Sequence, residues 1–150
     1  MIRNLIVGAA TLACAFSSPV FAKQYVDYSP AKGTWEINAI DVDPNHIDDY
    51  LTGLRKSQVP GFEIMKKHGI LDDYHFSVRT GYSKGSPSVL IMVHFTSYAM
   101  LEPDKARDQM IEKEIVATFS EDEGKAAVAG YEKYRQFIDD GYWTEVVMAK

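Results

Sequence analysis

The pattern of apolar and polar residues along the chain predicts four strands and two helical regions. Apolar and polar residues alternate over residues 34–42 and 74–82, whereas residues 88–96 are almost continuously apolar. Alternation is typical of strands with one buried face, and a continuous apolar stretch is typical of a strand covered on both faces. A fourth strand is predicted over residues 142–149, after Gly141.

Two regions between these strands have apolar residues at helical spacing. The first begins after Asp43, which suits an N-cap, and ends at Gly69, where a left-handed residue can close a helix. Pro60 is expected to kink or break this helix. The second region spans residues 100–140, and its sequence Ser-Glu-Asp-Glu from Ser120 onward is typical of a capping box that starts a new helix.

The order of these elements, β-α-β-β-α-β, predicts an α+β fold of the ferredoxin-like type. Right-handed crossovers joined by a hairpin place the strands in the order fourth, first, third, second in a four-stranded antiparallel sheet, with both helical regions on one face. We therefore expect a single domain over residues 34–150, preceded by a polar, turn-rich leader or linker over residues 23–33.

The side chains of the predicted strands divide into an apolar face and a mixed face. The apolar face carries Trp35, Ile37, Ala39, Phe76, Val78, Val89, Ile91, Val93, Phe95, Val146 and Met148. The mixed face carries Glu36, Asn38, Ile40, His75, Ser77, Arg79, Leu90, Met92, His94, Trp143, Glu145 and Val147. Because the Leu, Met and Trp side chains of the mixed face are too apolar to face water, we expect a second copy of the chain to cover it in an isologous homodimer.

Two residues do not fit this division. Ile40 and Val42 resemble core residues, although they fall on the mixed face. A bulge near Ala39 is one alternative, and a one-residue slip of the first strand would move Glu36 and Asn38 to the opposite face.

The N-terminus has the layout of a secretory signal peptide, in which one cation precedes an apolar stretch over residues 5–16. We expect cleavage after Ala22, which removes residues 1–22 and directs the protein to the periplasm or the medium. The alternative is a lipoprotein signal in which Cys14 is lipidated instead of removed. Thr11 stands where such signals usually have an aliphatic residue, so we favour cleavage.

The composition of the chain argues against several classes of partner. The 16 Lys and Arg residues against 21 Asp and Glu residues give a formal net charge of −5, and removal of Arg3 with the signal makes it −6. An acidic chain without a basic stripe is not expected to bind nucleic acid or an anionic membrane surface. Cys14 is the only cysteine, so its removal leaves no disulfide, thiolate nucleophile or cysteine metal ligand.

Three stretches, "WEINAIDVDPNHIDDYLTGL", "MKKHGIL" and "VLIMVHFTSYAML", resemble the dimeric α+β barrel superfamily, and in particular small secreted bacterial members without assigned function. The resemblance covers about residues 34–149. The superfamily includes cofactor-independent monooxygenases, haem-degrading enzymes, isomerases and proteins of unknown role. The resemblance implies a homodimer with a ligand cavity between the sheet and the helices of each subunit.

The resemblance also suggests a role for Asn38. In the haem-degrading and quinone-forming oxygenases, an Asn of the first strand lies seven residues before the turn residue that Asn45 occupies here. Such an amide can hydrogen-bond a substrate oxygen or a bound dioxygen species. The haem-degrading families also use a His in the second helical region, and residues 100–140 contain none. Haem degradation is therefore not expected, and no cofactor is predicted.

Two histidines are further candidates for chemistry. His75 and His94 share the mixed face, and diagonal neighbours on adjacent strands lie about 7–8 Å apart. Either imidazole can act as an acid or base on a bound phenol or enol, with Arg79 orienting an anionic group. Glu36 could complete a His-His-carboxylate metal set, but the spacing does not favour a metal site and none is predicted. The alternative is that both histidines are hydrogen-bonded interface residues.

The function predicted from these features is the binding of a small, largely apolar or aromatic molecule in the barrel cavity. The predicted ligand-binding residues are Glu36, Arg79, Met92 and Trp143. The alternative is a cofactor-independent monooxygenase or isomerase acting on a phenol- or enol-type substrate. The catalytic candidates for that activity are Asn38, His75 and His94.

Overall fold

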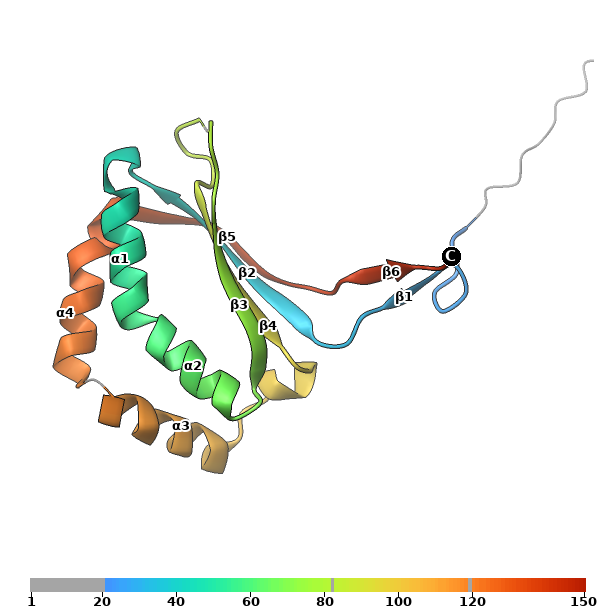
Figure 1. Cartoon of the computed structure of the whole chain (residues 1–150). Helices are drawn as coiled ribbons and strands as arrows, with labels where there is room; N and C mark the ends of the chain where they lie inside the picture. The colour runs from blue at the N-terminus through green and yellow to red at the C-terminus, as the bar shows by residue number, and fades with distance from the viewer. Residues whose placement is uncertain (1–20, 82, 119) are drawn as a thin grey trace, which may run out of the picture.

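A computed structural model describes residues 21–81, 83–118 and 120–150 and shows a four-stranded sheet with helices on one side (Figure 1). The strands of this sheet are β2 (Thr34–Val42), β3 (Leu71–Val78), β4 (Val89–Phe95) and β5 (Arg135–Trp143). The helices are α1 (Ile47–Ser57), α2 (Val59–Lys67), α3 (Lys105–Thr118) and α4 (Glu121–Tyr131). Most of the predicted signal peptide lies outside the described residues. None of the described helices combines the length and the apolar character that a membrane-spanning helix needs.

The sheet has the order β3-β4-β2-β5, and all neighbouring strands are antiparallel. This is the predicted order of fourth, first, third and second strand, so the α+β, ferredoxin-like fold is confirmed. The helix α4 packs beside α1, and α3 packs beside α2, so that no described helix covers the other face of the sheet (Figure 1).

The local signals for helix ends are confirmed. Asp43 caps the first helical turn, because its side chain accepts a hydrogen bond from the backbone N–H of Asn45. Gly69 has a φ of +68°, and the following Ile70 N–H donates to the carbonyl of Met65. The side chain and backbone of Ser120 complete the capping box at the start of α4. The first helical region breaks at Gln58, two residues before Pro60.

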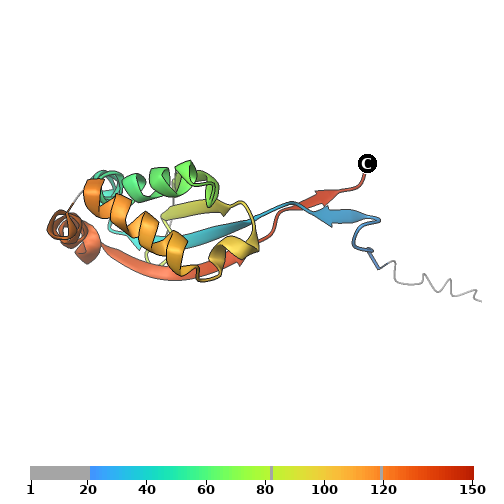
Figure 2. The ribbon, with the colours of Figure 1, turned by 90° about the horizontal axis from the view of Figure 1, so that it is seen from below.

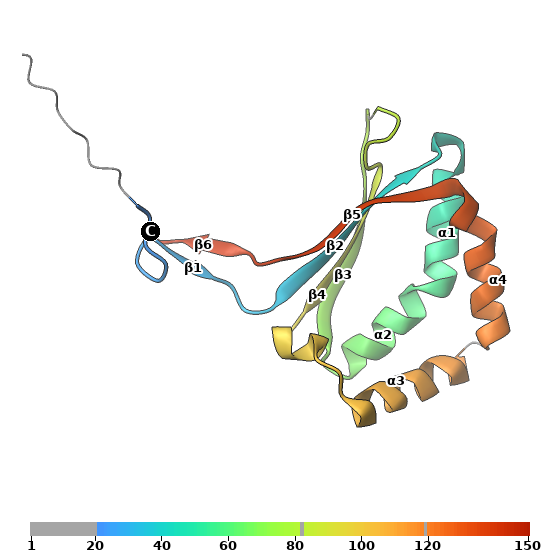
Figure 3. The ribbon, with the colours of Figure 1, turned by 180° about the vertical axis from the view of Figure 1, so that it is seen from behind.

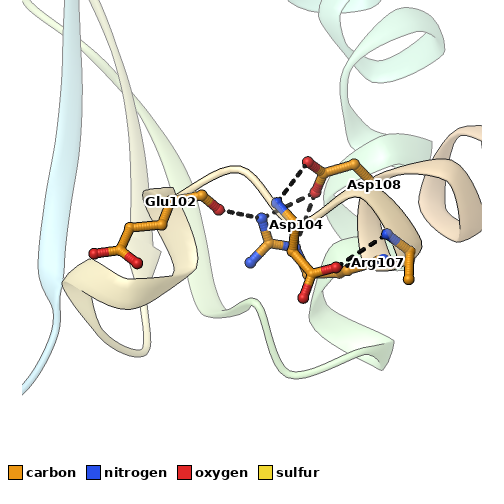
Figure 4. A network of polar contacts seen from close by, with 5 residues as sticks. Glu102, Asp104, Arg107 and Asp108 are labelled. Atoms are coloured by element: carbon orange, nitrogen blue, oxygen red, sulfur yellow. Dashed lines mark hydrogen bonds and ion pairs between the residues drawn. The ribbon is translucent and has the colours of Figure 1, made fainter.

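A polar network holds the start of α3 (Figure 4). Asp104 accepts hydrogen bonds from the backbone N–H groups of Ala106 and Arg107, both at 3.0 Å. The Arg107 guanidinium donates to the carbonyl of Glu102 at 2.7 Å and to the carboxylate of Asp108 at 2.9 Å. The helix therefore begins two residues after Pro103 and is tied to the turn that precedes it.

The position of the last sheet strand differs from the prediction. The helical pattern was expected to continue to residue 140 and a strand to cover residues 142–149, but β5 runs from Arg135 to Trp143. The spacing of Tyr131, Tyr134 and Ile138 suits a helix locally. The structure instead uses this segment to pair the second edge of β2, whose backbone groups would otherwise lack partners.

The remaining C-terminal residues form a separate two-stranded ribbon. The strand β6 (Val146–Met148) pairs antiparallel with β1 (Tyr28–Pro30), which lies in the segment expected to be a leader or linker. The views from below and behind show the ribbon extending beyond the sheet, away from the helices (Figures 2 and 3). The predicted strand residues Val146 and Met148 therefore belong to this ribbon and not to the main sheet.

The register of the sheet reverses the predicted faces of the first strand. Glu36 lies opposite Val93, Asn38 opposite Ile91 and Ile40 opposite Val89. Directly opposed residues share a face, and these three β4 residues are buried under the helices. Glu36 and Asn38 therefore lie on the helix side, and the predicted division was wrong by one residue in β2.

Burial of two aliphatic side chains explains the reversal. Ile40 and Val42 are both 0% exposed, and burying each such side chain stabilises the fold by about 1.5–3 kcal/mol. Glu36 and Asn38 are only half-buried on the helix side, so this gain is not opposed by the full cost of removing two polar side chains from water. A bulge is also present near Ala39, but it lies in the pairing with β5, where Ile138 is the extra residue.

The opposite side of the sheet is the open face, which no described helix covers. Its members are Trp35, Ile37, Ala39, His75, Ser77, Leu90, Met92, His94, Asp139, Gly141 and Trp143. The open face is mainly apolar on the central strands β2 and β4, and it contains both tryptophans of the chain.

A tyrosine that links α2 to β3 gives the fold a predicted dependence on alkaline pH. The Tyr74 hydroxyl donates a hydrogen bond to the Glu63 carboxylate, which raises the pKa of Tyr74 from 10.0 to about 12. Because the folded state keeps the tyrosine proton longer than the unfolded state, this contribution is complete below pH 10.0 and is lost as the pH rises toward about 12.

We expect the absorbance difference between the wild type and Tyr74→Phe to show a tyrosinate titrating near pH 12. Glu63→Gln removes the charge that holds the proton and should move this titration toward pH 10.0. An unchanged midpoint in Glu63→Gln would show that the carboxylate is not the cause of the shift.

Candidate functional site

A cavity of about 310 Å³ lies between the helix side of the sheet and the helices α1 and α2. Apolar side chains form most of its wall: Leu54, Phe62, Met65, Ile91, Val93, Phe95 and Phe137. Four polar side chains complete it: Glu36, Asn38, Gln58 and Arg135. The sheet supplies the floor of the cavity from β2, β4 and β5, and the two helices supply its roof.

The helical wall follows from residue spacing. Leu54, Gln58, Phe62 and Met65 recur at intervals of three and four residues, which places them on one side of the α1–α2 region despite the break at Gln58. The apolar members pack toward the core, where Leu54 is 1% exposed. Gln58 is the one polar residue of this row, and it brings an amide to the cavity wall.

The polar edge of the cavity is formed by Glu36 and Asn38, two residues of β2 that follow each other on the helix side of the sheet. The Asn38 amide nitrogen donates to one carboxylate oxygen of Glu36 at 3.4 Å, and both side chains are half-buried. Among the described residues, no other donor meets either side chain. The second Glu36 oxygen and the Asn38 carbonyl oxygen are therefore available as hydrogen-bond acceptors for a bound molecule.

The Glu36 carboxylate affects the pKa of a tyrosine on the neighbouring strand β5. Tyr142 lies directly opposite Glu36 in the β2–β5 pairing. Burial raises the pKa of Tyr142, and the negative charges of Glu36 and Asp140 raise it further. The hydroxyl of Tyr142 therefore keeps its proton to a higher pH than a free tyrosine does.

Arg135 brings a positive charge to the cavity. Its guanidinium lies 4.7 Å from the ring centre of Phe137 and 5.3 Å from that of Tyr131, distances that suit cation–π contacts. Burial raises the pKa of Tyr50, and the nearby Arg135 guanidinium opposes that effect. The cavity thus combines apolar walls with acceptors on β2 and a cation at the start of β5.

The predicted histidines lie elsewhere, on the open face. The Trp35 ring lies between them, with centroid distances of 4.9 Å to His75 and 4.8 Å to His94. The Nδ1 atom of His94 is 2.5 Å from a carboxylate oxygen of Asp72. His94 lies opposite Asp73 in the β3–β4 pairing, which makes it the diagonal neighbour of His75.

The structure therefore divides the predicted site residues between two surfaces. Glu36 and Asn38 line the cavity. Met92 and Trp143 share the open face with the two histidines. Arg79 lies beyond the end of β3, where its backbone N–H donates to the backbone carbonyl of Ser88. A metal set of His75, His94 and Glu36 is excluded because its members lie on opposite faces. In the described ranges, no cluster of three or more His, Cys, Asp or Glu residues could hold a metal ion.

Two polar residues of the cavity, Gln58 and Arg135, were not predicted as site residues from the sequence. Gln58 had a usable signal, since it is a polar residue in an apolar helical row. Arg135 had none, because its segment resembles the end of a helix.

Comparisons with known proteins identify similar folds. No model of a protein family matches the chain, and no curated protein matches it. A dimeric ferredoxin-like protein from an uncultured marine organism is 11% identical, covers 80% of this chain and 91% of its own, and has a TM-score of 0.47. A dimeric ferredoxin-like protein of unknown function from Thermobifida fusca is 12% identical, with coverages of 78% and 92% and a TM-score of 0.39.

A third similar structure is a NIPSNAP family protein with unknown function from Agrobacterium tumefaciens. It is 15% identical, with coverages of 79% and 88% and a TM-score of 0.40. The chain is similar to dimeric ferredoxin-like proteins. None of the three descriptions names a ligand or an activity.

Proposed function

We propose that this protein is a periplasmic or secreted homodimer that binds a small, largely apolar molecule carrying a hydrogen-bond donor. The observation that carries the proposal is the cavity between α1, α2 and the sheet, with apolar walls and two acceptor side chains on one edge. Ligand sites of proteins are typically apolar hollows with a few polar groups that orient the ligand.

The size and polarity of the cavity limit the class of ligand. Its volume of about 310 Å³ lies at the lower end of typical ligand sites, which suits a single substituted ring or a short chain. Glu36 and Asn38 offer oxygen acceptors, so the ligand is expected to present a hydroxyl or amino group to β2. A phenol meets both requirements.

The open face supports the homodimer. Trp35, Ile37, Leu90 and Met92 lie on the central strands with no described helix over them. An apolar surface of this kind marks an interaction site, and a second copy covers it symmetrically. The signal-peptide layout of residues 1–22 supports the location outside the cytoplasm.

Replacing the acceptor on β2 tests the binding site. Glu36→Gln keeps the size of the side chain but removes the charge, and a hydrogen bond to a charged group contributes about 1.5–3 kcal/mol. We expect the affinity for substituted phenols, measured by calorimetry, to fall by about tenfold or more. The matching methyl ethers, which lack the donor, should bind the wild type and the variant equally.

Glu112→Gln is the matched control, because Glu112 is exposed on α3 and should leave phenol affinity unchanged. If no phenol binds the wild type, or if Glu36→Gln and Glu112→Gln have equal effects, the cavity is not the binding site.

A second candidate function is an enzyme of the cofactor-independent oxygenase or isomerase type. The observation that favours it is the placement of Glu36 beside Asn38 inside a largely apolar cavity. Glu36 is positioned to take the proton of a phenol or enol, and the Asn38 amide and Arg135 to hold the resulting anion. Product analysis of the same phenol panel in aerated buffer separates the two functions, since a binding protein returns each phenol unchanged.

A further inference from the structure

The ribbon of β1 and β6 extends from the domain without a core of its own. Its strands have three residues each, and the β6 side chains are strongly exposed, with Val146 at 49%, Val147 at 56% and Met148 at 67%. A two-stranded ribbon alone is only marginally stable in water. Three consecutive exposed apolar residues in a paired strand therefore indicate a contact that this chain does not supply.

The ribbon and the open face lie on the same side of the molecule. The ribbon continues the β2–β5 pair and projects away from the helices, on the side that they leave uncovered (Figures 1 and 3). A partner protein bound to the open face would therefore also contact the ribbon. This continuity points to one partner for both surfaces.

The size of the open face supports this conclusion. Four strands about 4.8 Å apart, with about 3.3 Å per residue along the seven residues of β4, give a projected area of roughly 450 Å². Stable protein interfaces bury about 800 Å² on each partner. The open face alone falls short of this area, and the ribbon extends the surface in the direction where a partner would lie.

We infer that the ribbon packs against a second copy of this chain that is bound to the open face. The inference rests on the homodimer of the proposed function and adds the residues that hold it. Twofold symmetry lets each protomer place its ribbon on the other, so both ribbons are covered at once. The apolar side chains of β6 supply the contact.

A substitution that introduces a charged side chain into the ribbon tests this inference. Val147→Glu should raise the dissociation constant of the dimer by about tenfold or more in sedimentation velocity over a concentration series. The matched control is Val116→Glu, since Val116 on α3 is 55% exposed, close to the 56% of Val147, but lies on the helix side. This control should dimerise like the wild type.

Hydrogen exchange provides a second measurement that does not depend on a variant. The backbone amides of β6 should be protected in the dimer and lose protection on dilution to the monomer. The inference is overturned, with the homodimer retained, if Val147→Glu dimerises like the wild type or if the β6 amides exchange equally in both states. A wild type that remains monomeric at high concentration, alone or bound through the ribbon to a different protein, overturns the homodimer and this inference together.

Discussion

Ile37→Glu is expected to convert the protein from a dimer to a monomer. Ile37 lies on the central strand β2, opposite Met92 on one side and Gly141 on the other, and so near the middle of the open face. Near a twofold axis, the substitution brings two carboxylates close together or buries each without a partner. An unpaired buried charge costs about 3–5 kcal/mol, which corresponds to an increase of roughly 100-fold or more in the dissociation constant.

Sedimentation velocity over a concentration series measures this change. Met110→Glu serves as control, because Met110 is 40% exposed on α3 and lies away from the open face. The Ile37→Glu monomer should still bind phenols, since the cavity is on the other side of the sheet. A variant that dimerises as tightly as the wild type would show that the open face is not the interface.

Gly53→Ala is expected to destabilise the fold by about 1–3 kcal/mol, the usual cost of overpacking a core. In an unhindered helix the same change stabilises by up to about 1 kcal/mol. Here a Cβ atom on Gly53 would lie within 2.8 Å of three ring carbons of Tyr131. Tyr131 is 1% exposed and its hydroxyl is 2.8 Å from the Ser57 hydroxyl, so the ring cannot turn aside without losing that bond.

Urea unfolding followed by circular dichroism measures the free energy of unfolding of this variant. Gly130→Ala is the matched control, because Gly130 lies in α4 and a Cβ atom there would have no neighbour within 4 Å. It should raise the stability by about 0.5–1 kcal/mol. If Gly53→Ala is as stable as Gly130→Ala, α1 and α4 do not pack as closely as described.

The order and ends of most elements could be predicted from the sequence because their causes are local. Gly69 takes the left-handed conformation that ends α2, and Ser120 with Glu123 forms the capping box of α4. The strand β4 was placed correctly for the same reason, since its apolar stretch predicts a strand, although the structure buries only alternate residues of it. From these elements the β-α-β-β-α-β order and the sheet order followed.

The candidate site was predictable only in part. Asn38 and Glu36 were named as functional candidates, and both line the cavity. His75 and His94 were assigned to the same face as these residues, but they lie on the opposite side of the sheet. A one-residue difference in strand parity exchanges the two faces, and local alternation in β2 does not settle which parity holds.

The amino-acid sequence by itself thus determined the types of most main elements, their order and the helix caps at Asp43, Gly69 and Ser120. Only the tertiary structure decided the register of β2, the use of Arg135–Trp143 as a strand and the pairing of Tyr28–Pro30 with the C-terminus. Each of these depends on a partner strand far away in the chain. Local propensity does not encode these pairings. The free energy that stabilises them comes from backbone hydrogen bonds and core burial, which exist only when the distant segments are in contact.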